Sequence, residues 1–402
     1  MVMLERTFWA VGHGAFYTEQ FVDNNTDQCF TAVYDCGGKC IKKSVDDFLR
    51  NVKRNDNEKP CVDLLFISHF HYDHINGVQE LINKAAVKRI LIPQLSQLRL
   101  AEAYIYNSIQ TLDKRQTNST IKSAQQFIVN LATNKIKIPI TEVLVSGEGN
   151  SDEEIIIINE DAKLKDKWNN GLPIGVRYSR EKGDAQLTWL YIPINVGYDE
   201  LYAKKLISKI HSFSPIPIMD DDKHIIWENL DAVLKDAGCA KKIKEQYYLL
   251  YKKNHNAYSM PVFSGPETVK EKIYEWCDMR INNLHLVDMS IHCLGHFRGF
   301  DSCKLLSCLY MGDFETKNQV KFNVLKRILR KYYNAVGLQQ VPHHFSQNNH
   351  TSRLYEDRLI AFGNVSNNDK SFSSEVAGDI AFRECHPIVI KEDNTTRIKY
   401  YL

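Results

Sequence analysis

Three histidines and one aspartate stand close together in residues 68–77, which read SHFHYDHING. His69, His71, Asp73 and His74 form the pattern H-x-H-x-D-H. Imidazoles and carboxylates at such spacing are typical ligands of Zn²⁺, and a bound cation would relieve the repulsion between groups packed this closely. A lone histidine is more often a satisfied core or surface residue than a ligand, so the inference rests on the whole pattern. The sequence therefore predicts a metal site here.

The spacing within this pattern favours two metal ions. His69 and His71 can approach one point from the same side of the loop, while the other two ligands turn towards a second point. Two-metal hydrolytic sites hold their ions roughly 3.5–4 Å apart and need a bridging carboxylate and further imidazoles. Asp313 follows a glycine at the end of an apolar run, and His343 and His344 follow another such run. Because strand ends present functional groups in α/β sheets, we expect these residues to join the first group.

The surrounding elements are predicted to alternate between strand and helix. The unbroken apolar run 64–67 predicts a buried strand directly before the histidines, and helical spacing begins at Ile75. The polar residues then lie on the connection between these two elements. Further strands are expected at 7–11, 30–34, 87–93, 135–145, 154–158, 187–193, 254–264, 305–311, 336–341, 359–362, 387–390 and 397–401. Helices are expected at 41–52, 98–133, 198–253, 267–277 and 317–333, which gives a mixed α/β fold.

Four stretches resemble the metallo-β-lactamase superfamily, and within it the metallo-hydrolase domain of ComEC-like competence proteins and their free-standing relatives. V-G-H-G at 11–14 with Y-D-C-G-G at 34–38 is similar to that group's V-G-Q-G and D-x-G turns. Residues 68–77 resemble its metal loop, LYMGDFE at 309–315 its L-L-T-G-D-A-E, and VPHHFS at 341–346 its V-P-H-H-G-S. Asn256 and Ser259 resemble polar residues of the strand before its G-D motif.

The resemblance implies an α+β (α/β) fold, the four-layer αββα metallo-β-lactamase sandwich, as one domain over residues 1–402. It leaves about half of the chain unexplained. We interpret the unexplained parts as insertions, helical at about 98–133 and 198–253, with a third at about 267–302. A protein partner could bind through the helical insertions.

The resemblance also implies two groups of metal ligands. They are His69 and His71 for one ion, Asp73, His74 and either His343 or His344 for the other, and Asp313 as the bridge. Zn²⁺ is the expected metal, as one or two ions, with Mn²⁺ as an alternative. Asp35 would orient the metal loop through hydrogen bonds without binding an ion. On sequence grounds alone, Asp35 could equally be a turn residue.

Two departures from the family pattern bear on the site. Phe345 stands where the related sequences have glycine, and we expect it to narrow the mouth of the site. No histidine occurs between His74 and His211, so the middle histidine of many superfamily members is absent from its usual strand end near 193–195. ComEC-like sequences share this lack. His292 or His296 could substitute, although core or surface roles suit both residues better.

Composition and charge restrict the function classes. The 402 residues carry a formal net charge of +2, which gives no global reason to expect nucleic-acid or membrane binding. No apolar segment approaches the roughly 20 residues of a membrane span, and the first residues lack a signal-peptide stretch, so we expect a cytoplasmic protein. The ten cysteines are irregularly spaced, and we interpret them as reduced thiols, mostly buried. Cys36 and Cys40 could bind a metal as a pair, but no second pair matches them.

Residues 241–253 interleave lysines and tyrosines. Such a stretch could contact a polyanion. The favoured interpretation is a solvated helix face with tyrosines packed underneath.

These observations predict a metal-dependent hydrolase, and the resemblance favours phosphodiester bonds of a nucleic acid or nucleotide. Zinc lowers the pKa of bound water from 15.7 to about 7, and Asp73 would steer that water. Whichever of His343 and His344 is not a ligand could protonate a leaving group, and Ser346 could donate a hydrogen bond to the substrate. An ester, lactone or amide hydrolase is the alternative within the fold. A non-catalytic partner-binding module with a vestigial metal site is the alternative outside enzymes.

Overall fold

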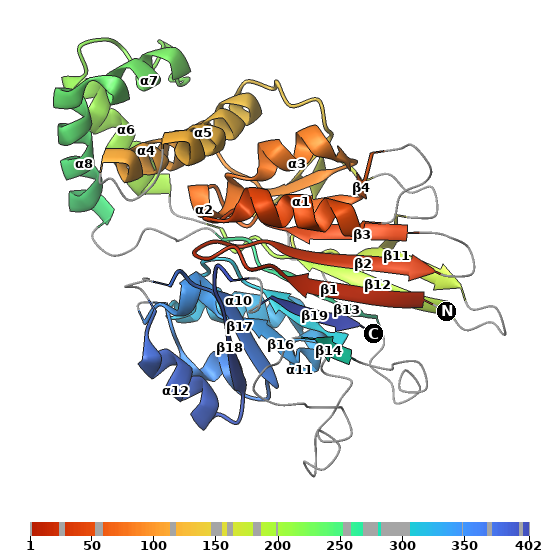
Figure 1. Ribbon diagram of the computed structural model, residues 1–402. Helices are drawn as coiled ribbons and strands as arrows, with labels where there is room; N and C mark the ends of the chain where they lie inside the picture. The colour runs from red at the N-terminus through yellow and green to blue at the C-terminus, as the bar shows by residue number, and fades with distance from the viewer. Residues whose placement is uncertain are drawn as a thin grey trace.

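The computed structural model describes residues 2–23, 29–52, 59–112, 118–145, 155–158, 164–179, 186–197, 200–251, 259–267, 280–282, 306–347, 349–367, 372–393 and 397–401. Two large sheets face each other, and helices cover the outer side of each (Figure 1). The predicted four-layer αββα arrangement is therefore confirmed. Within the described ranges no helix is long and apolar enough to cross a membrane.

The first sheet carries the metal loop. Its strands in the described ranges are β1 (Val2–Phe8), β2 (Tyr17–Asp23), β3 (Cys29–Tyr34), β5 (Leu64–Phe66), β7 (Ile90–Pro93), β8 (Ile140–Val143), β10 (Lys167–Trp168), β14 (Arg280–Asn282) and β19 (Ile398–Tyr401). They lie in the order β10-β8-β7-β5-β3-β2-β1-β19-β14. The pairs from β3 through β5 and β7 to β8 are parallel, so helical crossovers join them on the outer face. Strands β4 (Cys61–Val62) and β6 (Ala86–Val87) form a short separate pair.

The second sheet supplies the later site residues. Its described strands are β9 (Ile156–Ile157), β11 (Ile174–Ser179), β12 (Gln186–Pro193), β13 (Val262–Pro266), β15 (Cys308–Tyr310), β16 (Leu338–Gln340), β17 (Ile360–Asn364) and β18 (His386–Ile390). They lie in the order β18-β17-β16-β15-β13-β12-β11-β9. The pairs from β15 to β18 are parallel, so the segments after β15 and β16 leave the sheet at the same edge.

Helices cover the two outer faces (Figure 1). On the first sheet lie α1 (Ile41–Asn51), α2 (Tyr72–Ile75), α3 (Val78–Lys84), α4 (Gln97–Leu112) and α5 (Asn118–Ala132). Helices α6 (Glu200–Phe213), α7 (Trp227–Lys235) and α8 (Ala237–Tyr251) form a helical lobe that packs on α4 and shares its core. On the second sheet lie α10 (Gln319–Leu329), α11 (Lys331–Ala335) and α12 (Ser374–Phe382).

Three hydrophobic cores separate the four layers. One lies between the first sheet and its helices, one between the two sheets, and one between the second sheet and its helices. Successive side chains of β5 point into different cores, since Leu65 faces the helices while Leu64 and Phe66 face the other sheet. Across the middle core, the rings of Phe8 and Phe362 stack with their centroids 3.9 Å apart. The sandwich therefore fixes the relative position of the strand ends.

One buried carboxylate also ties the sheets together. Glu19 on β2 accepts from Arg6 Nε at 2.7 Å and from Tyr310 at 2.8 Å through one oxygen. Its other oxygen accepts from Ser264 at 2.7 Å and from Tyr191 at 2.8 Å. Because four donors satisfy this carboxylate, the charge can remain in the middle core.

Most predicted elements are present, with shifted ends. The region expected to be helical at 98–133 forms α4 and α5, and the region expected to be helical at 198–253 forms α6 to α8. The strand expected at 7–11 begins at Val2 and ends at Phe8, because the chain turns at Gly12, which has φ +72°. Strands β2 and β11 and helix α12 were not predicted. Along β2 the polar residues Thr18, Glu19 and Gln20 are buried, so the strand lacks the alternation of apolar and polar residues that would have predicted it.

Several other predictions can be compared with the structure. In α8, Tyr247 and Tyr251 are buried while Lys241 is exposed, which confirms the packed-tyrosine interpretation. The seven cysteines in the described ranges are free thiols, but only Cys36 and two others are buried, so the expectation of mostly buried thiols is wrong there. Residues 268–277 of the predicted helix, most of the insertion at 267–302, Asn256, His292 and His296 lie outside the described residues. The single-domain and insertion assignments remain predictions.

Candidate metal centre

The metal loop between β5 and α3 is held by a buried aspartate beneath it. Asp35, directly after β3, has φ +55° and accepts from the backbone N–H and the hydroxyl of Ser68, both at 2.7 Å. It also accepts from His74 Nδ1 at 2.7 Å. Ser68 Oγ in turn lies 2.9 Å from His69 Nδ1. Because the Nδ1 atoms of both histidines face oxygen acceptors, their Nε2 atoms are left to face the site.

Helix α4 clamps the same loop from the other side. Asn107 accepts from the backbone N–H of Tyr72 at 2.9 Å and donates to the carbonyl of Phe70 at 3.0 Å. The ring of Tyr106 stacks on that of His71, with centroids 3.8 Å apart. The helical segment that lay outside the sequence resemblance therefore positions the metal loop, a role that sequence reasoning missed.

Asp313 enters from the second sheet, after β15. Gly312 has φ +55°, and the backbone N–H groups of Met311 and Gly312 donate to Gln340 Oε1 at 2.7 and 2.9 Å. The backbone N–H of Asp313 donates to Ser259 Oγ at 2.9 Å, and that hydroxyl lies 3.2 Å from His69 Nδ1. Ser259 thus links the two sheets at the site.

His344 points into the site from the turn η3 (Pro342–Phe345), which follows β16. Its Nδ1 donates to the carbonyl of Asn364 at 2.8 Å, so its Nε2 faces inward. His343 is 27% exposed at the rim, and Asn349 Nδ2, which also donates to the carbonyl of Asp313, lies 3.0 Å from His343 Nδ1. The geometry therefore favours His344 over His343 as the ligand.

The expectation that Phe345 narrows the mouth is wrong. Phe345 is fully buried in the core between the second sheet and its helices, where its ring lies 5.6 Å from that of Phe372. Its φ of +64° turns the side chain away from the site. Ser346 is also buried, and its backbone N–H donates to the carbonyl of His343 at 2.8 Å. The role of the Ser346 hydroxyl towards a substrate stays a prediction.

Three groups of side chains in the described ranges have the geometry of metal ligands, with the potential ligand atoms of each group within 4.8 Å of one another. They are His69, His71 and Asp313; His74, Asp313 and His344; and His13, Asp73 and His344. Asp313 is common to the first two groups, as expected of a bridging carboxylate. All the predicted ligands except His343 appear in these groups.

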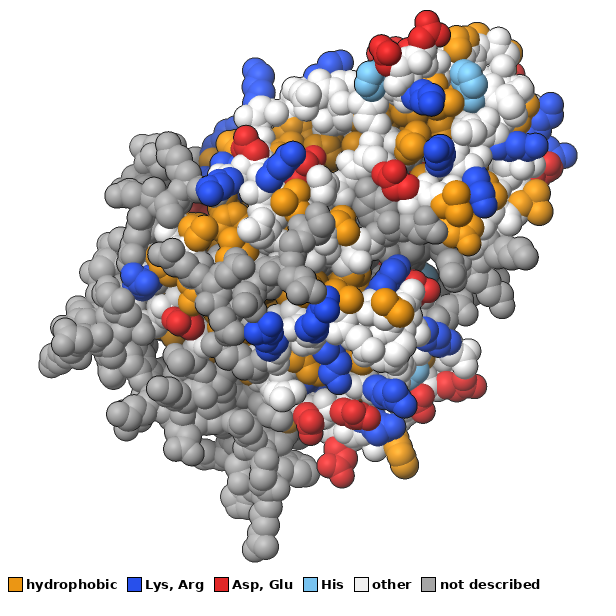
Figure 2. Space-filling model, turned by 180° about the vertical axis from the view of Figure 1, so that it is seen from behind, with side chains coloured by type: hydrophobic (Ala, Val, Ile, Leu, Met, Phe, Trp, Pro, Cys, Tyr) orange, Lys and Arg blue, Asp and Glu red, His pale blue; other side chains and the backbone are white. Residues whose placement is uncertain are grey.

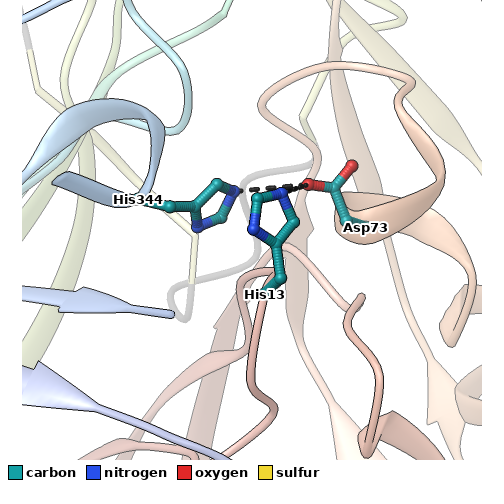
Figure 3. A group of neighbouring side chains, drawn as sticks. All are labelled: His13, Asp73 and His344. Carbon is teal, nitrogen blue, oxygen red and sulfur yellow. Dashed lines mark ion pairs between the residues drawn. The ribbon is translucent and has the colours of Figure 1, made fainter. Parts of the chain in front are cut away.

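His13 was not predicted as a site residue. It lies in the glycine turn after β1, and its Nε2 is 3.3 Å from Asp73 Oδ2 (Figure 3). The sequence has a histidine where the related group has glutamine, but the surrounding glycines indicate only a turn. Contact with Asp73 depends on how the first turn packs against the metal loop, which local sequence does not reveal.

The polar atoms of the site require a cation or protons between them. His74 and His344 each use Nδ1 as a donor, so in the neutral rings Nε2 is an acceptor. Yet His74 Nε2 lies 3.3 Å from Asp313 Oδ1, and His344 Nε2 lies 3.3 Å from Asp73 Oδ2. Acceptors facing carboxylates in a buried site are unfavourable unless a positive charge lies between them. This donor set, with imidazole and carboxylate groups converging, fits Zn²⁺.

Burial and the close approach of imidazoles and carboxylates also shift the pKa values of the site residues. Burial lowers the pKa of His74, but the carboxylates of Asp35, Asp313 and Asp73 together raise it well above its ordinary value. Burial raises the pKa of Asp73, but nearby imidazoles, first that of His74, lower it well below its usual range. The pKa of His71 is lowered by burial and by the adjacent His69. The site is therefore a closely coupled set of imidazoles and carboxylates in which ionised carboxylates are favoured.

The family model of the metallo-beta-lactamase superfamily matches residues 28–139. The match to this superfamily runs from the start of β3 through the metal loop and α4 to the start of β8. Asp313 and His344 lie outside it, and the structure brings them to the same place. No curated protein matches the chain closely enough to be called a relative. The chain is thus similar to the superfamily in its first sheet, its metal loop and its four-layer fold.

Proposed function

We propose that the chain is a metal-dependent hydrolase acting on phosphodiester bonds of a nucleic acid or nucleotide. The observation that supports this most strongly is the position of Asp313. Its Oδ2 lies 3.6 Å from His69 Nε2, and its Oδ1 lies 3.3 Å from His74 Nε2. One carboxylate thus joins two groups of imidazoles, which is the ligand arrangement of two-metal hydrolytic sites.

The ligands of each ion follow from the three groups. His69, His71 and Asp313 would hold one ion, and Asp73, His74, His344 and Asp313 the other. When bound, the metal, Zn²⁺ or Mn²⁺, makes water acidic enough to supply hydroxide near neutral pH and stabilises negative charge on the substrate. Orienting the water and contacting the substrate are then the roles of side chains of this chain.

Asp73 and His343 have different parts in this proposal. The pKa of Asp73 lies well below its usual range, so its carboxylate can accept a hydrogen bond from the attacking water and orient it. Burial lowers the pKa of His343 to about 4, so this ring is neutral at pH 7. Because Asn349 donates to its Nδ1, the proton is on Nε2, at the rim of the site. His343 is then suited to donating a hydrogen bond to a substrate oxygen rather than a full proton.

The choice of phosphodiester rests on the resemblance to the ComEC-like group and on the two-ion layout, which can bind both the attacking and the leaving oxygen. An ester, lactone or amide hydrolase would use the same layout. On the face shown in Figure 2, Lys and Arg side chains are intermixed with Asp and Glu.

The helical lobe supports a proposal about a protein partner. Of the eight exposed large apolar side chains in the described ranges, four lie in the lobe or its connections, namely Leu201, Tyr202, Ile216 and Leu249. Lys204, Lys205 and Lys209 follow the same face of α6 and line an open hollow with Leu201. A mixed apolar and basic surface of this kind suits an acidic protein segment.

The proposed reaction is tested with protein loaded with Zn²⁺ or Mn²⁺ and two chromogenic substrates, a phosphodiester and a lactone. We expect hydrolysis of the phosphodiester, and we expect Asp73→Ala to abolish it while the circular-dichroism spectrum stays unchanged. His343→Ala, at the rim, should keep metal and reduce the rate less. Activity on the lactone alone would overturn the choice of bond, and equal activity of Asp73→Ala and the parent would overturn the enzymatic proposal.

A further inference from the structure

We propose that His13 is a metal ligand that the H-x-H-x-D-H pattern does not include, and that it makes the Asp73 side of the centre the tighter of two metal positions. The inference shares one requirement with the proposed function, namely that metal binds at this centre. It does not depend on the substrate or on the reaction.

The geometry around Asp73 Oδ2 supports this assignment. His13 Nε2 and His344 Nε2 each lie 3.3 Å from this oxygen. Their rings are tilted by 37° with centroids 4.0 Å apart, and both nitrogens point towards the carboxylate (Figure 3). Around a tetrahedral ion with bonds of about 2.0–2.2 Å, neighbouring ligand atoms lie roughly 3.3–3.6 Å apart. The observed separations match this arrangement.

The turn that carries His13 is fixed against the metal loop. Gly12 and Gly14, on either side of His13, have φ +72° and +146°. A Cβ on Gly14 would lie 2.6 Å from the carbonyl oxygen of Asp73, and the backbone N–H of Ala15 donates to that same oxygen at 3.2 Å. The backbone that carries His13 is therefore tied to the backbone of Asp73. This contact holds the imidazole close to its partner before any ion binds.

His13 also occupies a different environment from the other candidate ligands. Its side chain is 26% exposed, whereas those of Asp73 and His344 are 6% and 2% exposed. The imidazole of His13 therefore lies nearer the solvent than the other two members of its group.

The two metal positions then differ in their number of donors. The first position has His69, His71 and Asp313, with one carboxylate. The second position has His13, Asp73 and His344. Two more donors lie close to them, since His74 Nε2 is 3.8 Å from Asp73 Oδ2 and Asp313 Oδ1 is 3.7 Å from His344 Nε2. More donors and a second carboxylate bind a divalent cation more tightly. Metal should therefore fill the second position first.

The test is a zinc titration of the full chain in competition with a chromophoric chelator. We expect the parent to bind one equivalent tightly and a second more weakly. His13→Ala should weaken the first equivalent at least tenfold and leave the second unchanged, and His71→Ala should do the reverse. With Co²⁺ as the probe, His13→Ala should also change the visible absorption of the first equivalent, which reports the number and type of ligands.

A second variant separates ligation from packing. His13→Gln keeps a polar side chain of similar length in the glycine turn but is a poor zinc ligand, so we expect it to behave like His13→Ala. If the glutamine variant binds the first equivalent as the parent does, or if both variants leave the zinc titration and the cobalt spectrum unchanged, the assignment of His13 is wrong while the proposed function stands. A parent that binds no metal overturns both.

Discussion

The metal loop after β5 and the turn after β16 both deliver imidazoles to the centre, but they are held in different ways. The loop has ordinary backbone geometry, and side chains from elsewhere, chiefly Asp35 and Asn107, hold it by hydrogen bonds. In the turn, His343, His344 and Phe345 have φ of 51°, 53° and 64°. Such left-handed geometry costs roughly 1–2 kcal/mol per residue outside glycine.

The two segments are therefore stabilised by different interactions. The strained turn is stabilised by burial of Phe345 in the outer core and by the hydrogen bond from His344 to Asn364. The loop depends on polar partners whose loss would leave buried donors unsatisfied. Substitutions that change packing should therefore affect mainly the turn, and substitutions that remove hydrogen bonds should affect mainly the loop. The predictions below test this contrast.

The largest effect is expected at Phe345. Phe345→Ala should lower the free energy of unfolding by about 3–5 kcal/mol, because it leaves a cavity in a close-packed core. Phe345→Gly should be about 1 kcal/mol more stable than the alanine variant, because glycine adopts φ +64° without strain. Urea unfolding monitored by fluorescence measures both values.

Phe362 is the matched control for this prediction. It is fully buried on the regular strand β17, so there glycine should be the less stable of the two substitutions. If glycine were also less stable than alanine at position 345, the turn would not be strained, and the contrast with the metal loop would disappear.

A smaller effect, but one directed at metal binding, is expected at Asp35. Asp35→Ala removes the acceptor of His74 Nδ1 and of Ser68, so the imidazole loses its orientation. Loss of such a partner typically weakens metal binding by about 10–100-fold. Competition with a zinc chelator measures the change.

Asp63→Ala is the control for Asp35→Ala. Asp63 accepts from the backbone N–H of Thr31 at 2.7 Å at the start of the same pair of strands, away from the candidate ligands. The Asp63→Ala variant should lose some stability without a change in zinc affinity. Equal zinc affinities for the Asp35 and Asp63 variants would show that Asp35 is only a turn residue.

The smallest effect is expected from the clamp on α4. Asn107→Ala removes one acceptor and one donor to the loop backbone, and zinc affinity should fall by roughly tenfold or less. Ser108→Ala, at the neighbouring position of the same helix, is the control, since its hydroxyl donates to the carbonyl of Tyr104 and accepts from Gln125 on α5, both away from the metal loop. Zinc affinity that is unchanged in Asn107→Ala would mean that α4 packs beside the loop without positioning its ligands.

The sequence predicted those parts of the centre that depend on local order along the chain. The positions of Asp313 and of the pair His343 and His344 after apolar runs, taken together with the first loop and the family resemblance, predicted that they meet the metal loop, because strand ends present functional groups. The choice between the two histidines stayed open until the geometry of the turn was known. The contacts of His13, Tyr106 and Asn107 depend instead on how a turn and a helix dock against the loop. The direction of Phe345 depends on the sign of one backbone angle. The glycine of the related sequences at position 345 is a signal of a positive φ there, whereas the docking of a turn or a helix leaves no such signal.

Metal content is the most direct test of the claim that distant segments of the chain converge to bind divalent cations. Inductively coupled plasma mass spectrometry, on protein purified without chelator, counts the ions per chain. We expect the parent to retain at least one ion and to reach two when zinc is supplied in excess, and Asp313→Ala to lose the second. A folded parent that holds no ion under either condition would contradict the account.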